Sequence, residues 1–209
     1  MFNFAQGQAS GPEGLRPGGE GEDFNHRNTR QVFRGLKSES DAEIGQKGVF
    51  SKGLRGVLME TKFIADSMLG KLAKWLRVLG YDTLYQTFYE EGAVAESARE
   101  GRKVLSRHKP TITRYTNSVL IHSDHVKDQL YELKNGGTIT SDRSEWFSRC
   151  LLCNIPLEET KEADARENVP EYVFYQSASE IRFCPSCGRY FWPGSHRERM
   201  VRQLEEWGL

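Results

Sequence analysis

The 209-residue chain has a balanced charge and a modest apolar content. It carries 29 Lys and Arg against 29 Asp and Glu, with 37% hydrophobic residues. This length favours one main domain with a small appendage. No run approaches the roughly 18 apolar residues that a membrane span needs, and the first residues lack the pattern of a secretory signal. These features exclude a membrane-spanning protein, and we expect a cytoplasmic location.

Residues 1–58 are predicted to be a disordered or non-native N-terminal extension. Of the 20 glycines, 11 lie in residues 1–60, without a helical or strand period. Such polar, Gly-rich sequence buries too little apolar surface to offset chain entropy. A targeting peptide is the competing interpretation, but transit peptides avoid acids and residues 1–60 contain eight.

The first strong pattern is a strand, a helix and a second strand. Residues 62–66 predict a short buried strand that ends in Asp66, and residues 81–85 predict another. Between them, one face of a helix over residues 67–80 carries Leu69, Leu72, Leu76 and Leu79. A strand–helix–strand unit of this length predicts a parallel α/β sheet.

The α/β pattern continues to about residue 140, and we assign residues 60–145 to this domain. A helix is expected from Ala93, and a later helix is expected to begin after Ser123 or Asp124 as N-cap. Strands are predicted over residues 103–106 and 118–122.

Acidic residues follow two of the predicted strands. Asp66 and Asp124 occupy the carboxyl ends, where ligands gather in parallel sheets. Glu90 and Glu91 precede a helix that can face the same edge. Converging carboxylates would bind Mg²⁺ or Mn²⁺, and such an ion can activate water and clamp a phosphodiester. The alternative is a simple N-cap at Asp124 and solvated glutamates.

All four cysteines fall in two CxxC pairs separated by 30 residues: Cys150 and Cys153, then Cys184 and Cys187. This spacing predicts one tetrahedral Zn²⁺, which is structural because four thiolates leave no open position. Disulfides are the competing account, against which the lack of a secretory signal argues. Residues 146–209 then form a zinc ribbon and a C-terminal helix, with an acidic solvent loop over residues 158–171.

The end of the ribbon combines aromatic and basic residues from Tyr190 to Met200. Such residues can stack on bases and contact phosphates. The alternative is that Phe191 and Trp192 pack the ribbon and that Ser195 caps the last helix. Better candidates for RNA contacts than the aromatics are Arg189, Arg197 and Arg199.

Three segments resemble the Mut-seven C-terminal ribonuclease-like domain: Phe63–Asp82, Ser148–Asn154 and Tyr190–His196. The resemblance covers roughly residues 60–202. It implies a PIN-like α/β nuclease domain followed by a four-cysteine zinc ribbon. It also implies metal-dependent ribonuclease activity.

The resemblance assigns roles residue by residue. Asp66 matches the acid after the first strand, Asp124 resembles the late-strand acid, and Glu91 best fits the acid before the helix. His108 stands where the family has an aspartate, which removes a negative charge that would hold a hard cation. Imidazole still binds Mn²⁺ more readily than Mg²⁺.

The first hypothesis is therefore a ribonuclease in which Asp66, Glu91 and Asp124 are catalytic and Asp66 and Asp124 bind Mg²⁺ or Mn²⁺. Basic side chains would contact the RNA backbone, namely Lys71, Lys74, Arg77, Arg107 and Arg197. The second is a catalytically weakened RNA-binding or ribonucleoprotein-associated protein, and the third is an interaction module whose partner covers the acidic face. The RNA substrate, the cleavage mode and the oligomeric state stay open.

Overall fold

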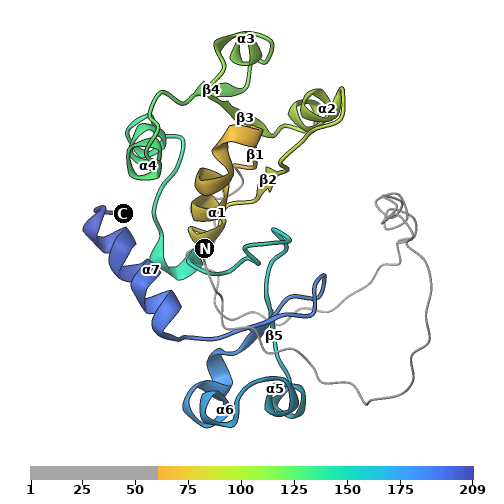
Figure 1. Cartoon of the computed structure of the whole chain (residues 1–209), viewed down its shortest axis with the longest axis vertical. Helices are drawn as coiled ribbons and strands as arrows, with labels where there is room; N and C mark the ends of the chain where they lie inside the picture. The colour runs from red at the N-terminus through yellow and green to blue at the C-terminus, as the bar shows by residue number, and fades with distance from the viewer. Residues whose placement is uncertain (1–60) are drawn as a thin grey trace, which may run out of the picture. The chain divides into compact units, whose positions relative to one another are not determined.

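The computed structural model of the chain describes residues 61–209, so the extension predicted over residues 1–58 lies outside the described residues. Figure 1 shows this part of the chain and labels its α-helices and the strands β1 to β5. The first part of the chain forms β1 Phe63–Ala65, the 3-10 helix η1 Ser67–Leu69, α1 Gly70–Val78, β2 Thr83–Tyr85, α2 Ala93–Arg99, β3 Lys103–Ser106, α3 Lys109–Ile112, β4 Ser118–Leu120 and α4 Val126–Asn135. The second part forms η2 Arg143–Glu145, β5 Glu158–Glu159, α5 Glu162–Asn168, α6 Glu171–Ser177, η3 Ala178–Glu180, β6 Arg182–Phe183, β7 Tyr190–Phe191 and α7 Ser195–Glu206.

The predicted parallel sheet is confirmed. Its strands lie in the order β2-β1-β3-β4, and all three pairings are parallel. From β1 the chain passes to β2 on one side and then returns to β3 on the other side. The connections therefore change direction between β1 and β3, which is the position where open α/β sheets bind ligands outside their carboxyl ends.

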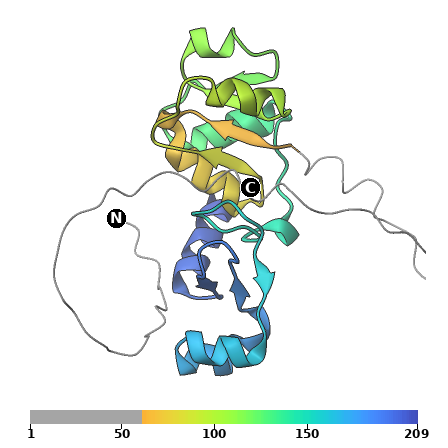
Figure 2. The same cartoon turned by 90° about the vertical axis from the view of Figure 1, so that its right-hand side faces the viewer.

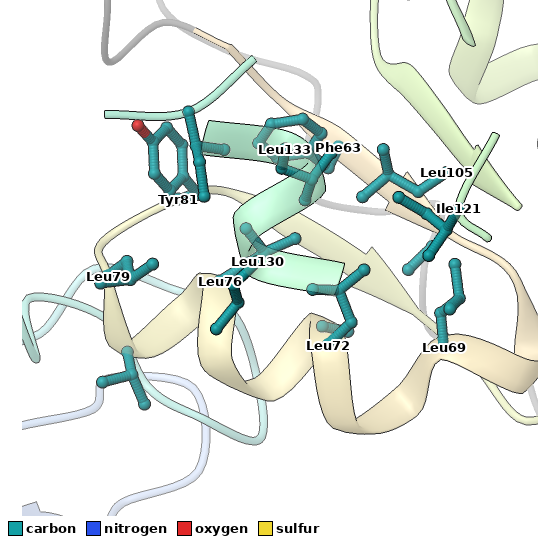
Figure 3. Packing of buried hydrophobic residues seen from close by; sticks show 14 of the residues in the cluster. Phe63, Leu69, Leu72, Leu76, Leu79, Tyr81, Leu105, Ile121, Leu130 and Leu133 are labelled. Atoms are coloured by element: carbon teal, nitrogen blue, oxygen red, sulfur yellow. The ribbon is translucent and has the colours of Figure 1, made fainter. Parts of the chain in front are cut away.

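One face of the sheet packs against α1 and α4 to form the main core (Figure 3). The predicted leucine stripe of α1 is buried here, with Leu72 and Leu76 fully enclosed. Phe63 and Leu105 contribute from the sheet, and Leu130 and others contribute from α4. Ile64 and Val104 are buried outside this cluster. They alternate with the residues that face α1, as the two-residue period of a strand requires.

Two details of the first domain differ from the sequence prediction. The short helix α3 lies between β3 and β4, where no helix was predicted from the sequence. The helix α4 begins at Val126 after His125, and no side chain caps it. Ser123 and Asp124 do not act as N-caps because other side chains hold both of them.

The segment between η2 and α7, which we call the ribbon, contains an antiparallel sheet of order β5-β6-β7 and the helices α5 and α6. Figure 2 shows α5 and α6 on the side of this small sheet that is away from the parallel sheet. The acidic solvent loop expected over residues 158–171 is wrong, since this segment forms β5 and α5. Ala165 and Val169 bury their side chains with Phe174 in a second small core. Tyr190 and Trp192 pack against this core, which supports the packing role for Trp192. Phe191 belongs to neither core cluster of the described residues.

The last helix, α7, returns to the first domain. Leu204 is buried in the main core, and the rings of Trp207 and Trp75 lie 4.8 Å apart. Gly194 is the N-cap of α7, and no side chain caps it, so the expected Ser195 cap is wrong. Within the described residues, we find no helix with the length and apolar content needed to span a bilayer.

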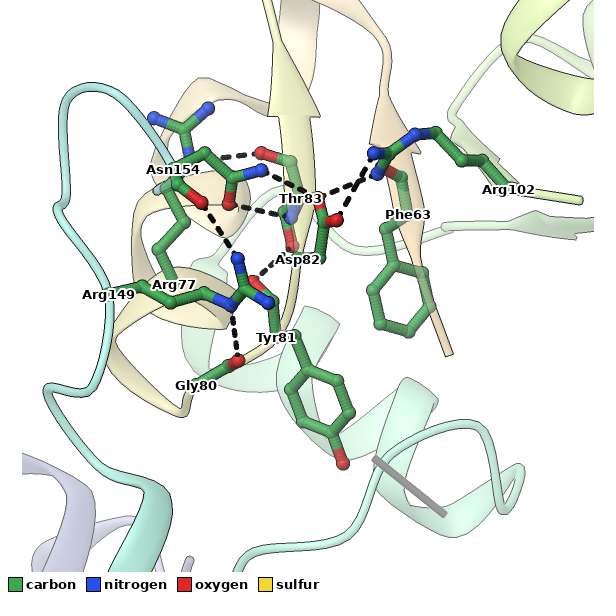
Figure 4. A network of polar contacts seen from close by, with 9 residues as sticks. All are labelled: Phe63, Arg77, Gly80, Tyr81, Asp82, Thr83, Arg102, Arg149 and Asn154. Carbon is green, nitrogen blue, oxygen red and sulfur yellow. Dashed lines mark hydrogen bonds and ion pairs between the residues drawn. The ribbon is translucent and has the colours of Figure 1, made fainter. Parts of the chain in front are cut away.

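A buried polar network joins the ribbon to the start of the parallel strands (Figure 4). Arg77 donates to the carbonyl oxygen of Thr83 at 2.9 Å. It also donates to the carbonyl oxygens of Leu151 and Leu152 at 2.9 and 3.0 Å. Asn154 accepts from the Thr83 backbone N–H at 2.9 Å and donates to Asp82 at 2.6 Å. The ribbon is therefore attached at the amino-terminal edge of the sheet, which is the edge opposite to the predicted carboxylate site.

Replacing Arg77 by alanine is expected to lower the free energy of unfolding by about 3 kcal/mol or more. The Arg77 side chain is 6% exposed, and its loss leaves three carbonyl acceptors without a charged donor. The matched control is Lys74→Ala, because Lys74 is an exposed residue of the same helix and should change stability by less than about 0.5 kcal/mol. Denaturant unfolding of the two variants measures the difference, and equal stabilities would contradict this role.

Candidate functional site

Asp66 lies immediately after β1, at the point where the sheet connections change direction. Its Oδ1 accepts hydrogen bonds from the Ser67 hydroxyl at 3.0 Å and from the Met68 backbone N–H at 3.3 Å. Its Oδ2 accepts from the hydroxyl of Ser106, the last residue of β3, at 2.6 Å. Three donors from two neighbouring strand ends therefore fix the orientation of this carboxylate.

Tyr89 is a neighbour of Asp66 that the sequence analysis missed. Its hydroxyl donates to the carbonyl oxygen of Ala65 at 2.7 Å and accepts from the Gln86 backbone N–H at 3.1 Å. Burial and the negative charge of Asp66 raise the pKa of Tyr89 above its ordinary value. Tyr89 thus stays protonated at neutral pH and binds the backbone directly before Asp66.

Asp124 lies at the same edge of the sheet, but its carboxylate forms an ion pair with Arg107. The preceding loop is held by Glu132 of α4, which accepts from the backbone N–H groups of His122 and Ser123 at 2.8 Å. Burial opposes ionisation of Glu132, but these donors and the Ser123 hydroxyl hold its pKa below the ordinary value. Glu132 therefore fixes the loop that carries Asp124, a role that no local sequence signal indicates.

The other two residues proposed for the site, His108 and Glu91, are not among the hydrogen-bond donors to the Asp66 carboxylate. His108 is exposed before α3, with its Nδ1 3.0 Å from the hydroxyl oxygen of Thr111. Its backbone N–H donates to the Ser106 hydroxyl at 3.0 Å, so Ser106 connects Asp66 to His108. Glu91 is exposed in the turn that precedes α2.

These acids do not form a closed metal cage. In residues 61–209, the single group of three or more His, Cys, Asp or Glu side chains close enough to share an ion is the cysteine group. Asp66 and Asp124 follow β1 and β4, and β3 lies between these strands, so the strand axes are about 10 Å apart. The carboxylate oxygens therefore fit an ion that one or two carboxylates hold. Water and a substrate phosphate would complete its coordination, as they often do for Mg²⁺.

The cysteine pairs form two turns with the same hydrogen-bond pattern. In the first, the Asn154 backbone N–H donates to the carbonyl oxygen of Cys150, and in the second that of Gly188 donates to Cys184, each at 2.9 Å. Asn154 and Gly188 both have positive φ, at 64° and 69°. The left-handed conformation after each pair turns the backbone so that both thiols of the pair face the same point.

The four sulfur atoms fit a tetrahedral metal ion. All lie within 4.8 Å of one another, and those of Cys150 and Cys187 are 3.8 Å apart. A tetrahedron with metal–sulfur bonds of about 2.3 Å has edges of about 3.8 Å. Burial raises the pKa of the Cys150 thiol to about 12, so a cation is needed to hold this group as a thiolate at neutral pH.

The structure separates the predicted RNA contacts into three kinds. Lys71 and Lys74 are exposed on α1. Arg107 is paired with Asp124, and Arg197 lies over the ring of Phe147 at 5.0 Å. Arg77 is buried and bound to carbonyl oxygens of the protein, so the expectation of an RNA contact there is corrected: its guanidinium stabilises the junction with the ribbon.

Comparison with known proteins identifies a family. Residues 61–204 match a family model described as the Mut7-C RNAse domain. No curated protein and no solved structure matches the chain. The matched range includes both the parallel sheet and the cysteine turns.

Proposed function

Because the chain belongs to the Mut7-C RNAse domain family, we propose that it is a metal-dependent ribonuclease that hydrolyses RNA phosphodiester bonds. The observation that supports this most strongly is the position of Asp66. Its carboxylate is oriented by Ser67 and Ser106 at the carboxyl edge of the sheet, between the two strands where the connections change direction.

Asp66 is proposed as the principal ligand of a Mg²⁺ or Mn²⁺ ion, with Asp124 as the second carboxylate. A bound divalent ion would stabilise charge on the phosphodiester and lower the pKa of a coordinated water. The hydroxyl of Ser106 keeps Oδ2 of Asp66 in place. This contact fixes the direction of the remaining lone pairs of the carboxylate, which would bind the ion. Glu91 would add negative charge at the rim of the site.

Arg107 is proposed to bind the RNA phosphate. In the structure its guanidinium neutralises Asp124, and a phosphate would compete with that carboxylate for the same donors. Lys71 and Lys74 would attract the RNA backbone to this side of α1 through their exposed charges.

The four cysteines are proposed to hold a structural Zn²⁺. The ion would fix the ribbon relative to Arg77 and Asn154, and the ribbon would aid RNA binding through Arg197. A Zn²⁺ with four thiolates carries a net negative charge. The buried guanidinium of Arg77, which lies near Cys150 and Cys153, is well placed to balance that charge.

A second candidate function is RNA binding with weak or no cleavage. One observation favours it, since Arg107 already pairs with Asp124. The family resemblance also implies an aspartate at the position of His108. The ion pair and the histidine both lower the negative charge that would hold a divalent ion.

The two functions are separated by incubating the zinc-loaded chain with labelled single-stranded RNA and Mn²⁺, beside an Asp66→Asn and Asp124→Asn double variant. The ribonuclease proposal predicts cleavage by the wild type and none by the variant. Salt-sensitive binding with the same low cleavage in both proteins would favour the binder.

A further inference from the structure

A hollow of about 710 Å³ lies away from the Asp66 edge, between the ribbon turns, α6 and α7. We refer to it as the ribbon groove. Four arginines and two glutamates line it, which leaves an excess of positive charge: Arg149, Arg182, Arg189, Arg197, Glu180 and Glu198. This charge favours an anionic ligand.

Two of the four guanidinium groups are available to such a ligand. Arg149 and Arg182 donate to backbone carbonyl oxygens of the protein. The Arg189 side chain makes no hydrogen bond or ion pair with another residue in the described part of the chain. Arg197 stacks on Phe147, and this contact leaves the edge of its guanidinium group for hydrogen bonds.

Aromatic rings lie beside these charges. Tyr172 of α6 is 63% exposed, and Trp192 is partly exposed, and both line the ribbon groove. Grooves that combine guanidinium groups with accessible rings are typical of single-stranded nucleic-acid sites, because bases stack on the rings while arginines bind phosphates. The chemistry therefore matches single-stranded RNA better than a small anion.

The ribbon groove and the Asp66 edge are at opposite ends of α1. Asp66 precedes the start of α1 through η1, whereas Leu151 and Leu152, which line the groove, bind Arg77 in the last turn of α1. The nine residues of α1 alone span about 13 Å. A strand that contacts both places must therefore extend several nucleotides beyond the reacting phosphodiester.

We propose that the ribbon groove is a second binding site for single-stranded RNA, remote from the Asp66 edge, which favours long substrates over short ones. This inference rests on the proposed ribonuclease function for its effect on cleavage. The binding step itself does not depend on cleavage.

The test compares RNA oligonucleotides of about 4 and about 16 nucleotides, a range that covers the site sizes of single-strand-binding folds. The groove variant is Arg189→Ala with Tyr172→Ala. The matched control is Arg202→Ala with Tyr175→Ala, since Arg202 is exposed on α7, Tyr175 is 68% exposed on α6, and neither lines the groove. The zinc-loaded full chain is used throughout, with fluorescence anisotropy for binding and kcat/KM for cleavage.

The groove variant is expected to bind the long RNA about tenfold or more weakly than the wild type and the control, and to cleave the short RNA at the wild-type rate. Unchanged binding of the long RNA would overturn the proposal. If the groove variant lost binding and kcat/KM equally for the short and the long RNA, the proposal would be overturned as well, since the groove would then belong to the reaction site. If the wild type cleaves nothing but binding still depends on the groove, the ribonuclease proposal fails and this one is supported.

Discussion

Asp66→Asn is expected to reduce RNA cleavage more than about a hundredfold while the protein stays folded. Asparagine has the same shape and keeps a carbonyl oxygen that can accept from Ser67 or Ser106. It lacks the negative charge that would hold a divalent ion, and such ions supply several kcal/mol of transition-state stabilisation. The measurement is the single-turnover cleavage rate of labelled RNA at saturating Mn²⁺.

The control for this loss is Asp128→Asn, because Asp128 is exposed on α4 and outside the candidate site. It should cleave at the wild-type rate. Circular dichroism and denaturant unfolding must show that the Asp66 variant is folded. Cleavage by a folded Asp66→Asn variant within a factor of two of the wild type would exclude this residue from the reaction.

Cys184→Ser is expected to release the zinc and to lower the free energy of unfolding by more than about 4 kcal/mol. Cys184 is fully buried, and structural zinc sites supply folding free energy directly. The loss should also loosen the second core, because Ile181 lies only three residues before this cysteine and is buried in that core. Zinc content by mass spectrometry and denaturant unfolding measure the two effects.

Ser186→Ala is the matched control, since Ser186 is exposed within the same turn. This variant should retain one zinc per chain and change stability by less than about 1 kcal/mol. A Cys184→Ser variant that keeps full zinc content and wild-type stability would show that the four sulfurs do not act as one site.

The parts of the fold that sequence predicted are those with a strong local pattern. The stripe of Leu72 and Leu76 fits one helix face only, and it is buried as expected. The cysteine spacing predicted two turns that meet, and the sulfur atoms lie within 4.8 Å of one another. Each of these signals is contained in a short segment, so no knowledge of distant contacts is needed to read it.

The parts that sequence did not predict depend on contacts between distant segments. Arg77 looks like an exposed base on α1, but its partners Leu151 and Leu152 lie more than 70 residues away along the chain. Ser106 and Glu132 orient acidic residues or their loop from other elements.

The acidic segment that becomes β5 and α5 was misread for a similar reason. Its acidic composition favours a solvent-exposed loop, whereas burial of Ala165 and Val169 is enough to hold one face of α5 against the second core. Tertiary packing of a few apolar residues decided the structure of that segment.

The most direct test of the account is the binding of Mn²⁺ at Asp66. Mn²⁺ is titrated into the zinc-loaded wild type and into the Asp66→Asn variant, and free Mn²⁺ is followed by electron paramagnetic resonance. The wild type is expected to bind one Mn²⁺ that the variant does not bind. Equal Mn²⁺ binding by the two proteins would contradict the assignment of Asp66 as the ligand on which the proposed hydrolysis depends.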